Sequence, residues 1–176
     1  MKILFLDIDG VLQSEDAELY FSSEPKLIAG LNEKFNIDFS VYPTYTVFNC
    51  LYDWNEQAIA RLKYILDQTG AGIVASTDWR SPTQPNKMRD LFTIHGLEKY
   101  YIADNPFVPV KTNFEQDRAW EIGKSLEIYK PETFLVLDNC VGLRQFFPNN
   151  SVITNDLLSI NDMHEAVRIL KRKKVV

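Results

Sequence analysis

The chain has 176 residues, of which 45% are hydrophobic and 24% are charged, as is typical of a globular protein with one hydrophobic core. Its net charge of −5 argues against strong non-specific binding to nucleic acid, and no stretch approaches the roughly 18 apolar residues of a membrane-spanning helix. The two cysteines, Cys50 and Cys140, have no metal-binding or redox spacing. We therefore expect a single cytoplasmic domain, residues 1–176, with reduced thiols.

The first predicted element is a strand, "KILFLDI" (2–8), which is apolar on both faces like a central strand of a parallel sheet. Residues 13–53 differ in character, and we predict that they form a small insertion after this strand. Within it, "SSEPKLIAGLNEKF" (22–35) favours a short helix with Ser23 as its N-cap. "DFSVYPTYTVFNCLY" (38–52) is rich in aromatic and β-branched residues, which predicts one or two short strands.

The rest of the chain alternates between helical and strand patterns. "DWNE" (53–56) has the spacing of a capping box and predicts a helix that ends near Gly70. Ser159 and Asp162 are cap candidates for the last predicted helix. We expect further strands at 72–76, 99–104, 131–139 and 150–155, and further helices at 86–92, 114–129 and 159–174. This alternation predicts a three-layer α/β/α sandwich around a mostly parallel, Rossmann-like sheet.

Polar residues stand where three apolar segments end. "ILFLD" ends at Asp7, "GIVAS" at Ser76 and "FLVLD" at Asp138. Ligands bind outside the carboxyl ends of the strands in open parallel sheets, so we expect these residues and Asp9 to line one crevice. Carboxylates crowded there raise one another's pKa values unless a cation neutralises them, and Mg²⁺ prefers oxygen ligands of this kind. The pattern therefore favours Mg²⁺-dependent phosphoryl transfer.

The same segments carry a family resemblance. "DIDGVL" (7–12) resembles the first motif of the haloacid dehalogenase superfamily, "IVAS" (73–76) resembles the second, and "FLVLDN" (134–139) resembles the fourth. More narrowly, "IVASTDWR" (73–80) and "RAWEI" (118–122) are similar to the haloacid dehalogenase-like phosphatase domain of Swiss-army-knife RNA repair proteins. The resemblance implies a haloacid dehalogenase-like fold.

The resemblance also implies roles for individual residues. Asp7 would be the nucleophile that forms an aspartyl-phosphate, and Asp9 would be the general acid and base. Ser76 would hydrogen-bond the phosphoryl group, although Thr77 could take this role if the strand runs one residue further. Asp7, Asp9 through its backbone carbonyl, and Asp138 would hold Mg²⁺.

The fourth motif departs from the family pattern, and the third motif leaves two candidates for its cation. Asn139 stands where the fourth motif often has a second acid, so we expect it to ligate the metal with one negative charge fewer. The cation of the third motif is either Arg118, which begins "RAWEI", or Lys111 in the preceding loop. For Arg80 we favour a structural ion pair with Asp78 or Asp90.

The implied activity is that of a phosphohydrolase that acts on a phosphomonoester. The alternatives are a phosphotransferase, a nucleic-acid end-processing phosphatase, and a receiver-like or non-catalytic phosphate-binding module. Residues 13–53 fall outside the resemblance, and insertions at this point of the superfamily lie over the active site, so we expect a small cap there. The expected partners are a small phosphorylated substrate or a nucleic-acid end.

Overall fold

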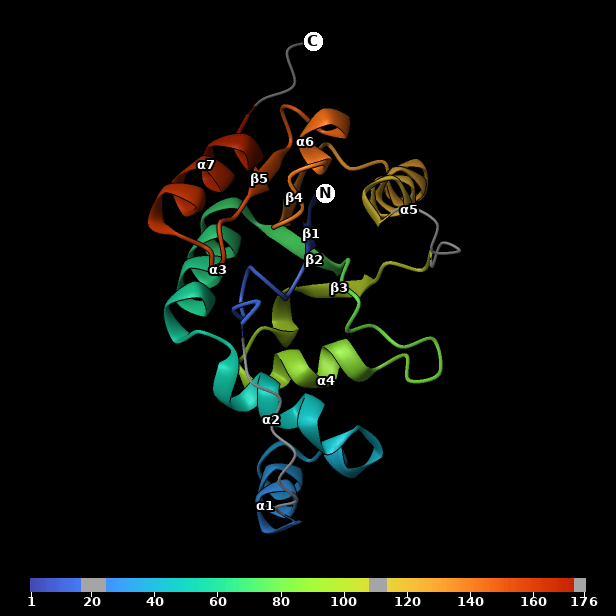
Figure 1. Cartoon of the computed structure of the whole chain (residues 1–176), viewed down its shortest axis with the longest axis vertical. Helices are drawn as coiled ribbons and strands as arrows, with labels where there is room; N and C mark the ends of the chain where they lie inside the picture. The colour runs from blue at the N-terminus through green and yellow to red at the C-terminus, as the bar shows by residue number, and fades with distance from the viewer. Residues whose placement is uncertain (17–24, 108–113, 173–176) are drawn as a thin grey trace.

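A computed structural model describes residues 1–16, 25–107 and 114–172 of the chain (Figure 1). The strands are β1 (Lys2–Leu6), β2 (Ala71–Ala75), β3 (Tyr101–Asp104), β4 (Thr133–Asp138) and β5 (Ser151–Ile153). The helices are α1 (Pro25–Phe35), α2 (Thr44–Asp53), α3 (Glu56–Thr69), α4 (Lys87–Ile94), α5 (Phe114–Tyr129), α6 (Leu143–Phe146) and α7 (Ile160–Leu170). Two short 3-10 turns span Phe39–Val41 and Glu98–Tyr100. In this described part of the chain, no helix combines the length and the apolar character needed to cross a membrane.

The five strands form one parallel sheet in the order β3-β2-β1-β4-β5. The central strand β1 pairs with β2 on one side and with β4 on the other, so Leu4 stands opposite both Ile73 and Leu135. Strand β1 is apolar at nearly every position because both of its faces are covered. The predicted α/β sandwich with a parallel, Rossmann-like sheet is confirmed.

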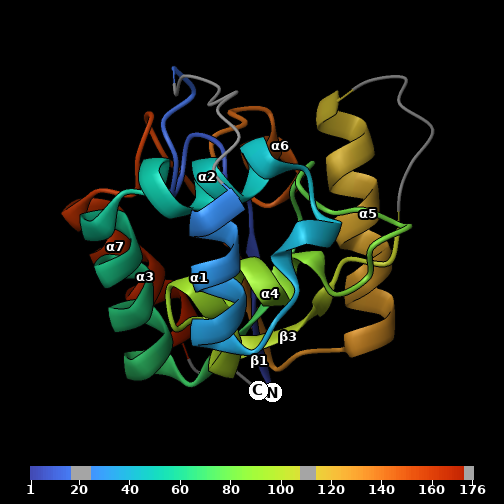
Figure 2. The ribbon, with the colours of Figure 1, turned by 90° about the horizontal axis from the view of Figure 1, so that it is seen from below.

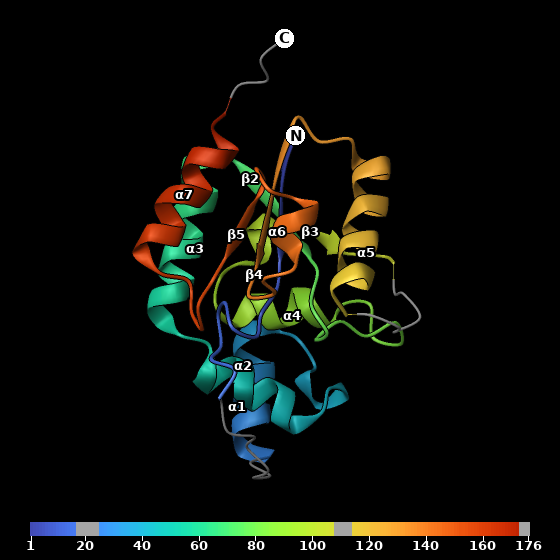
Figure 3. The same cartoon turned by 45° about the horizontal axis from the view of Figure 1, so that its top comes forward.

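Helices cover both faces of the sheet, as Figure 3 shows with α3 and α7 on one side and α5 and α6 on the other. Alternate residues of β1 point to opposite faces. Leu4 and Leu6 join the larger core cluster with residues of α3, α4 and α7. Ile3 and Phe5 join a second cluster with residues of α5 and α6. This packing fixes the direction of β1 and therefore where its carboxyl end emerges.

The segment from α1 to α2 lies at the end of the molecule opposite the N-terminus, on the side to which the strands point (Figure 3). Figure 2, seen from that end, shows α1 in front of the sheet. It has a small core of its own around Leu31, Phe39, Tyr42 and Val47. Helix α2 contacts α4, and the Cys50 thiol lies 3.5 Å from the Leu91 carbonyl oxygen. The segment is thus attached to the sandwich through α4, and its description as a cap remains a prediction.

The strands expected within 38–52 are wrong, because residues 44–53 form helix α2. Pro43 precedes the first turn, and the helical spacing divides the apolar residues between two cores. Val47 faces the small core of the segment, whereas Cys50 faces the main core. Strand propensity depends strongly on packing, and here packing against two cores overrides it.

Two predicted helix starts have different outcomes. Helix α3 is capped by Asn55, whose side chain accepts hydrogen bonds from the backbone of Gln57 and Ala58 at 3.0 Å each. The capping box predicted at residues 53–56 is therefore wrong. Helix α7 has the predicted capping box of Ser159 and Asp162. The N-cap predicted at Ser23 lies outside the described residues. The predicted end of the last helix at residue 174 is wrong, because α7 ends at Leu170 and Lys171 is its C-cap.

Candidate active site

Asp7 lies directly beyond β1, and its backbone continues the ladder by donating to the Leu137 carbonyl at 3.0 Å. The residue is 5% exposed, and its carboxylate accepts a hydrogen bond from the Ile8 backbone at 2.9 Å. Burial and the nearby Asp138 raise the pKa of Asp7, although Arg118 and the Thr77 hydroxyl act in the opposite direction. Asp7 is thus a buried carboxyl whose charge depends on the cations around it.

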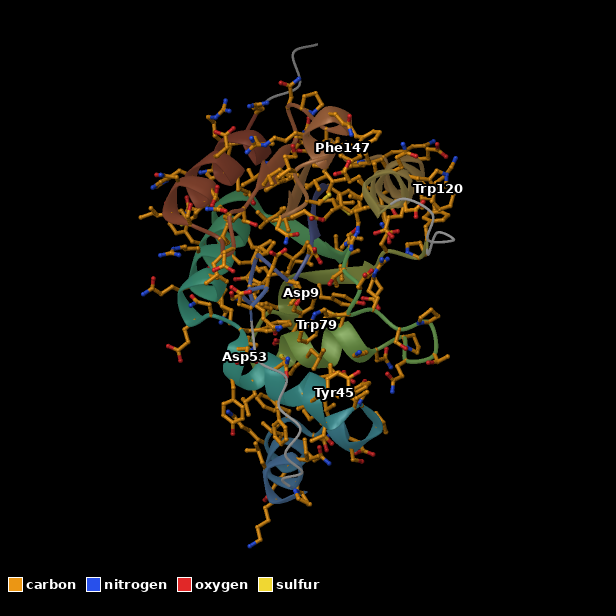
Figure 4. The ribbon with its side chains drawn as sticks, viewed as in Figure 1. Asp9, Tyr45, Asp53, Trp79, Trp120 and Phe147 are labelled. Atoms are coloured by element: carbon orange, nitrogen blue, oxygen red, sulfur yellow. The ribbon has the colours of Figure 1, made fainter. Side chains whose placement is uncertain are left out.

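Asp9 is held by two side chains at the turn that follows β1. Its carboxylate accepts from the Trp79 indole at 3.0 Å and from the Gln13 amide at 3.4 Å, and Figure 4 shows Trp79 beside it. Partial burial raises the pKa of Asp9, whereas the Trp79 hydrogen bond lowers it. Gly10 allows the turn because its φ is +69° and because Asn139 leaves no room there for a side chain. Neither Trp79 nor Gln13 was among the residues predicted for this site.

Two neighbouring hydroxyl groups follow β2 and have different partners. The Ser76 hydroxyl donates to Glu121 at 2.6 Å and is directed toward α5. The Thr77 side chain lies close enough to Asp7 to lower the pKa of that carboxyl, and its hydroxyl accepts from the Trp79 backbone at 3.3 Å. Of the two candidates from the second motif, Thr77 is therefore the one whose hydroxyl faces Asp7.

Arg118 projects from α5 into the group of carboxylates and is 3% exposed. Its guanidinium lies 3.7 Å from Asp7 and 4.0 Å from Asp138 through the same nitrogen, Nη1. It also lies 3.6 Å from Asp78, which is on the exposed side. One arginine thus links the carboxyl ends of β1 and β4. Lys111, the alternative cation, lies outside the described residues.

Glu121 is a buried acid that the sequence analysis missed. It is one helical turn from Arg118, with 3.7 Å between the Arg118 Nε and a Glu121 oxygen. Its carboxylate also accepts from Ser76 and from Arg80, the latter at 3.0 and 3.2 Å. The predicted pairing of Arg80 with Asp78 or Asp90 is wrong, because Arg80 binds Glu121. The i,i+3 spacing within "RAWEI" was the available signal, since it places both side chains on one helix face.

Asp138 is the last residue of β4, and its carboxylate accepts from the Cys140 backbone at 2.8 Å. Its own burial raises the pKa of Asp138. The side chain of Asn139 lies against Gly10 and donates to Glu15, which is on the segment that follows β1. Asp138 therefore faces Arg118 and Asp7, whereas the amide nitrogen of Asn139 is directed to Glu15.

The charges of the site favour a cation. Asp7, Asp138 and Glu121 are buried acids, and the guanidinium groups of Arg118 and Arg80 supply two positive charges among them. Across the described ranges, no three acidic, histidine or cysteine side chains converge closely enough to hold a metal. Mg²⁺ commonly uses one or two carboxylates and completes its shell with waters and substrate phosphate, so an oxygen donor pair of this kind fits that ion.

The parallel sheet, the acids at the carboxyl ends of β1 and β4, and the segment that follows β1 together define a haloacid dehalogenase-like protein. Residues 3–164 match the family described as the HAD domain in Swiss Army Knife RNA repair proteins. The match covers most of the chain, so the chain belongs to this family and the resemblance is confirmed. The match also runs through residues 13–53, so the expectation that these residues fall outside the family is wrong. No curated protein and no solved structure gives a significant match.

Proposed function

We propose that the chain is a Mg²⁺-dependent phosphomonoester hydrolase that works through an aspartyl-phosphate on Asp7. The observation that carries this proposal is the environment of the Asp7 carboxylate, which is buried at the end of the central strand beside Thr77 and Arg118. An attacking carboxylate needs a fixed position and compensation for the charge on the phosphoryl oxygens. These neighbours supply a fixed position and positive charge.

In the proposed first step, an Asp7 carboxylate oxygen attacks phosphorus and the bond to the leaving oxygen breaks. Asp9 donates a proton to that oxygen, so the alcohol leaves in its neutral form. The burial that raises the pKa of Asp9 favours its protonated form and suits it to this task. In the second step, Asp9 takes a proton from water as the water attacks phosphorus, which releases phosphate and regenerates the Asp7 carboxylate.

The other residues act on the phosphoryl group and on the metal. Arg118 offsets negative charge on the phosphoryl oxygens, and the Thr77 hydroxyl orients Asp7 or donates to the same oxygens. Asp7 and Asp138 would hold Mg²⁺ together with the Asp9 backbone carbonyl, as the family resemblance implies. The bound cation would supply further charge compensation at the phosphate. Asn139 would contribute its side-chain oxygen, because its amide nitrogen donates to Glu15.

The test is turnover of an aryl phosphate with added Mg²⁺. We expect many product molecules per protein molecule, and we expect EDTA to stop the reaction. A phosphorylated receiver would instead take up about one phosphoryl group and release it slowly. A burst limited to one equivalent, or a rate that EDTA does not change, would contradict the proposal. Transfer of the phosphoryl group to an added alcohol in place of water would favour the phosphotransferase alternative.

A nucleic-acid end is the second candidate for the substrate class. The chain belongs to a family of domains in RNA repair proteins, and repair of a broken strand requires chemistry at its ends. The net charge of −5 disfavours binding of a nucleic-acid strand through its phosphates alone. Any preference for a nucleic-acid end must therefore come from contacts within the active site. Comparison of kcat/KM for phosphorylated oligonucleotides with that for sugar phosphates tests this candidate, and higher values for the sugar phosphates would contradict it.

A further inference from the structure

A cavity of about 290 Å³ opens between α2 and the turns that follow β1 and β2. We call it the leaving-group pocket and define it by six of its lining residues: Asp9, Gln13, Tyr45, Asn49, Trp79 and Lys87. Two of these, Tyr45 and Asn49, come from α2. Figure 4 shows Tyr45 of α2 on the same side of Asp9 as Trp79. The pocket thus joins the candidate active site to the segment from α1 to α2.

The pocket begins at the proton donor of the proposed mechanism. Trp79 and Gln13 both line the pocket and both hydrogen-bond the Asp9 carboxylate. Because Asp9 must lie next to the oxygen that leaves, whatever carries that oxygen extends from Asp9 into the space beside it. The occupant of the pocket is therefore the alcohol part of the substrate.

The walls of the pocket suit a flat group with polar edges. Trp79 is partly buried, and Tyr45 is 46% exposed, so both offer aromatic surface. Asn49 and Gln13 are 3% and 6% exposed, and among the described residues neither amide oxygen has a hydrogen-bond donor. Buried amides with unused bonding capacity recognise the edges of a base, and aromatic side chains stack on its faces.

The charged lining residues and the volume of the pocket further restrict which chemical group can bind there. Asp9 and Asp78 both line the pocket, so a neutral group is favoured beside them. The ammonium of Lys87, at the start of α4, is the cation of the pocket within the described ranges. A volume near 290 Å³ is at the lower end of the range for small-molecule sites, so it has room for one small group and excludes several nucleotides at once.

We infer that the leaving-group pocket binds the nucleoside whose hydroxyl carries the scissile phosphate. This inference rests on the proposed function, because it takes Asp9 as the group that protonates the leaving oxygen. The base contacts Tyr45 and Trp79, and the amides of Asn49 and Gln13 bond to its polar edge. Lys87 is then available to a second phosphate, such as the next phosphodiester of a strand.

Binding to the full-length Asp7→Asn variant tests the pocket without turnover. Isothermal titration calorimetry in the presence of Mg²⁺ would compare nucleoside 5′- and 3′-monophosphates with glycerol phosphate and inorganic phosphate. We expect at least one class of nucleotide to bind about tenfold more tightly than glycerol phosphate, because only the nucleotide has a base that stacks on the aromatic side chains. Equal dissociation constants for all of these ligands would overturn the inference.

A matched pair of tyrosines on α2 supplies the control. We expect Tyr45→Ala, made in the Asp7→Asn background, to remove most of the preference for nucleotides. Tyr52 lies on the same helix, is 56% exposed and is not among the described residues that line the pocket. Tyr52→Ala should therefore keep the preference. Loss of the preference in both variants, or in neither, would overturn the role assigned to Tyr45.

The two proposals fail in different ways. If wild-type protein turns over aryl phosphate but the variant binds nucleotides no better than glycerol phosphate, the pocket inference fails and the phosphatase proposal stands. If nucleotides bind selectively but no phosphomonoester is hydrolysed, the phosphatase proposal fails. A terminally phosphorylated dinucleotide distinguishes a strand end from a free nucleotide as the source of the nucleoside. If the dinucleotide binds more tightly than the mononucleotide and Lys87→Met abolishes the difference, the source is a strand end. If the mononucleotide binds more tightly, the source is a free nucleotide.

Discussion

The Ser76 and Thr77 hydroxyls are adjacent in the chain, but they face different groups. Both residues lie just beyond the end of β2, where their side chains turn to different neighbours. The Ser76 hydroxyl satisfies Glu121, which is 2% exposed, whereas the Thr77 hydroxyl reaches Asp7. The Ser76 hydroxyl could donate to a phosphoryl oxygen only after it leaves Glu121. That change is unfavourable unless another donor takes its place at the buried carboxylate. This geometry favours Thr77 as the hydroxyl that acts in the reaction.

Substitution of each hydroxyl separates the two roles. We expect Thr77→Val to lower kcat/KM on an aryl phosphate by about 10- to 100-fold, since hydrogen bonds to charged groups contribute about 1.5–3 kcal/mol. Ser76→Ala should instead lower the free energy of unfolding by about 1–3 kcal/mol, because it removes a donor from a buried acid. Steady-state kinetics and urea denaturation of both variants measure these effects. A larger loss of kcat/KM in Ser76→Ala would contradict the assignment.

At the scale of elements, the sequence predicted where the strands place the acids of the candidate site. Asp7 and Asp138 were predictable because each follows an apolar run that becomes a buried parallel strand. Glu121 was not predictable in the same way, since its role depends on how α5 packs against the end of β2. Residues 38–52 were assigned wrongly because strand propensity reports packing, and no local pattern revealed the two cores on which α2 lies.

The turn between β1 and the inserted segment depends on Gly10. Its φ is +69°, and a Cβ added there would lie 2.4 Å from the Asn139 side-chain nitrogen and 2.7 Å from its Cβ. We expect Gly10→Ala to lower the free energy of unfolding by more than about 1 kcal/mol. It should also lower activity, because the strain displaces the turn that carries Asp9.

Gly30 within α1 is the control for this substitution. A Cβ there meets nothing within 4 Å, so we expect Gly30→Ala to stabilise the protein by about 0.5–1 kcal/mol, the usual effect within a helix. Urea denaturation of both variants measures the difference. Equal stability of the two variants would show that the Gly10 turn tolerates a side chain.

At the scale of the whole molecule, His95 connects the inserted segment to the sandwich. It follows α4, and its ring stacks on Trp54 with 5.2 Å between the ring centroids. Its Nε2 lies 2.7 Å from the Cys50 carbonyl oxygen of α2, and because a carbonyl only accepts, Nε2 carries the proton. Burial lowers the pKa of His95 below its ordinary value of 6.5. The ring is therefore held in its neutral form within this junction.

This burial predicts that His95 makes the fold sensitive to acid. A histidine whose pKa is lower in the folded than in the unfolded state favours folding above about pH 6.5, and the contribution is lost as the pH falls through the folded pKa. We expect the free energy of unfolding to fall more steeply from pH 8 to pH 5 in the wild-type protein than in His95→Gln. Urea denaturation across this range measures both slopes, and parallel slopes would contradict the prediction.

The most direct test of the central claim is to find the residue that carries the phosphoryl group during turnover. An aryl leaving group needs little protonation, so Asp9→Asn should still be phosphorylated, but it lacks the base that activates water. After acid quenching, mass spectrometry should find one phosphoryl group on the peptide that contains Asp7. We expect this species to accumulate in Asp9→Asn and to be absent from Asp7→Asn. A phosphoryl group on Asp138, or full hydrolysis by Asp7→Asn, would contradict the account.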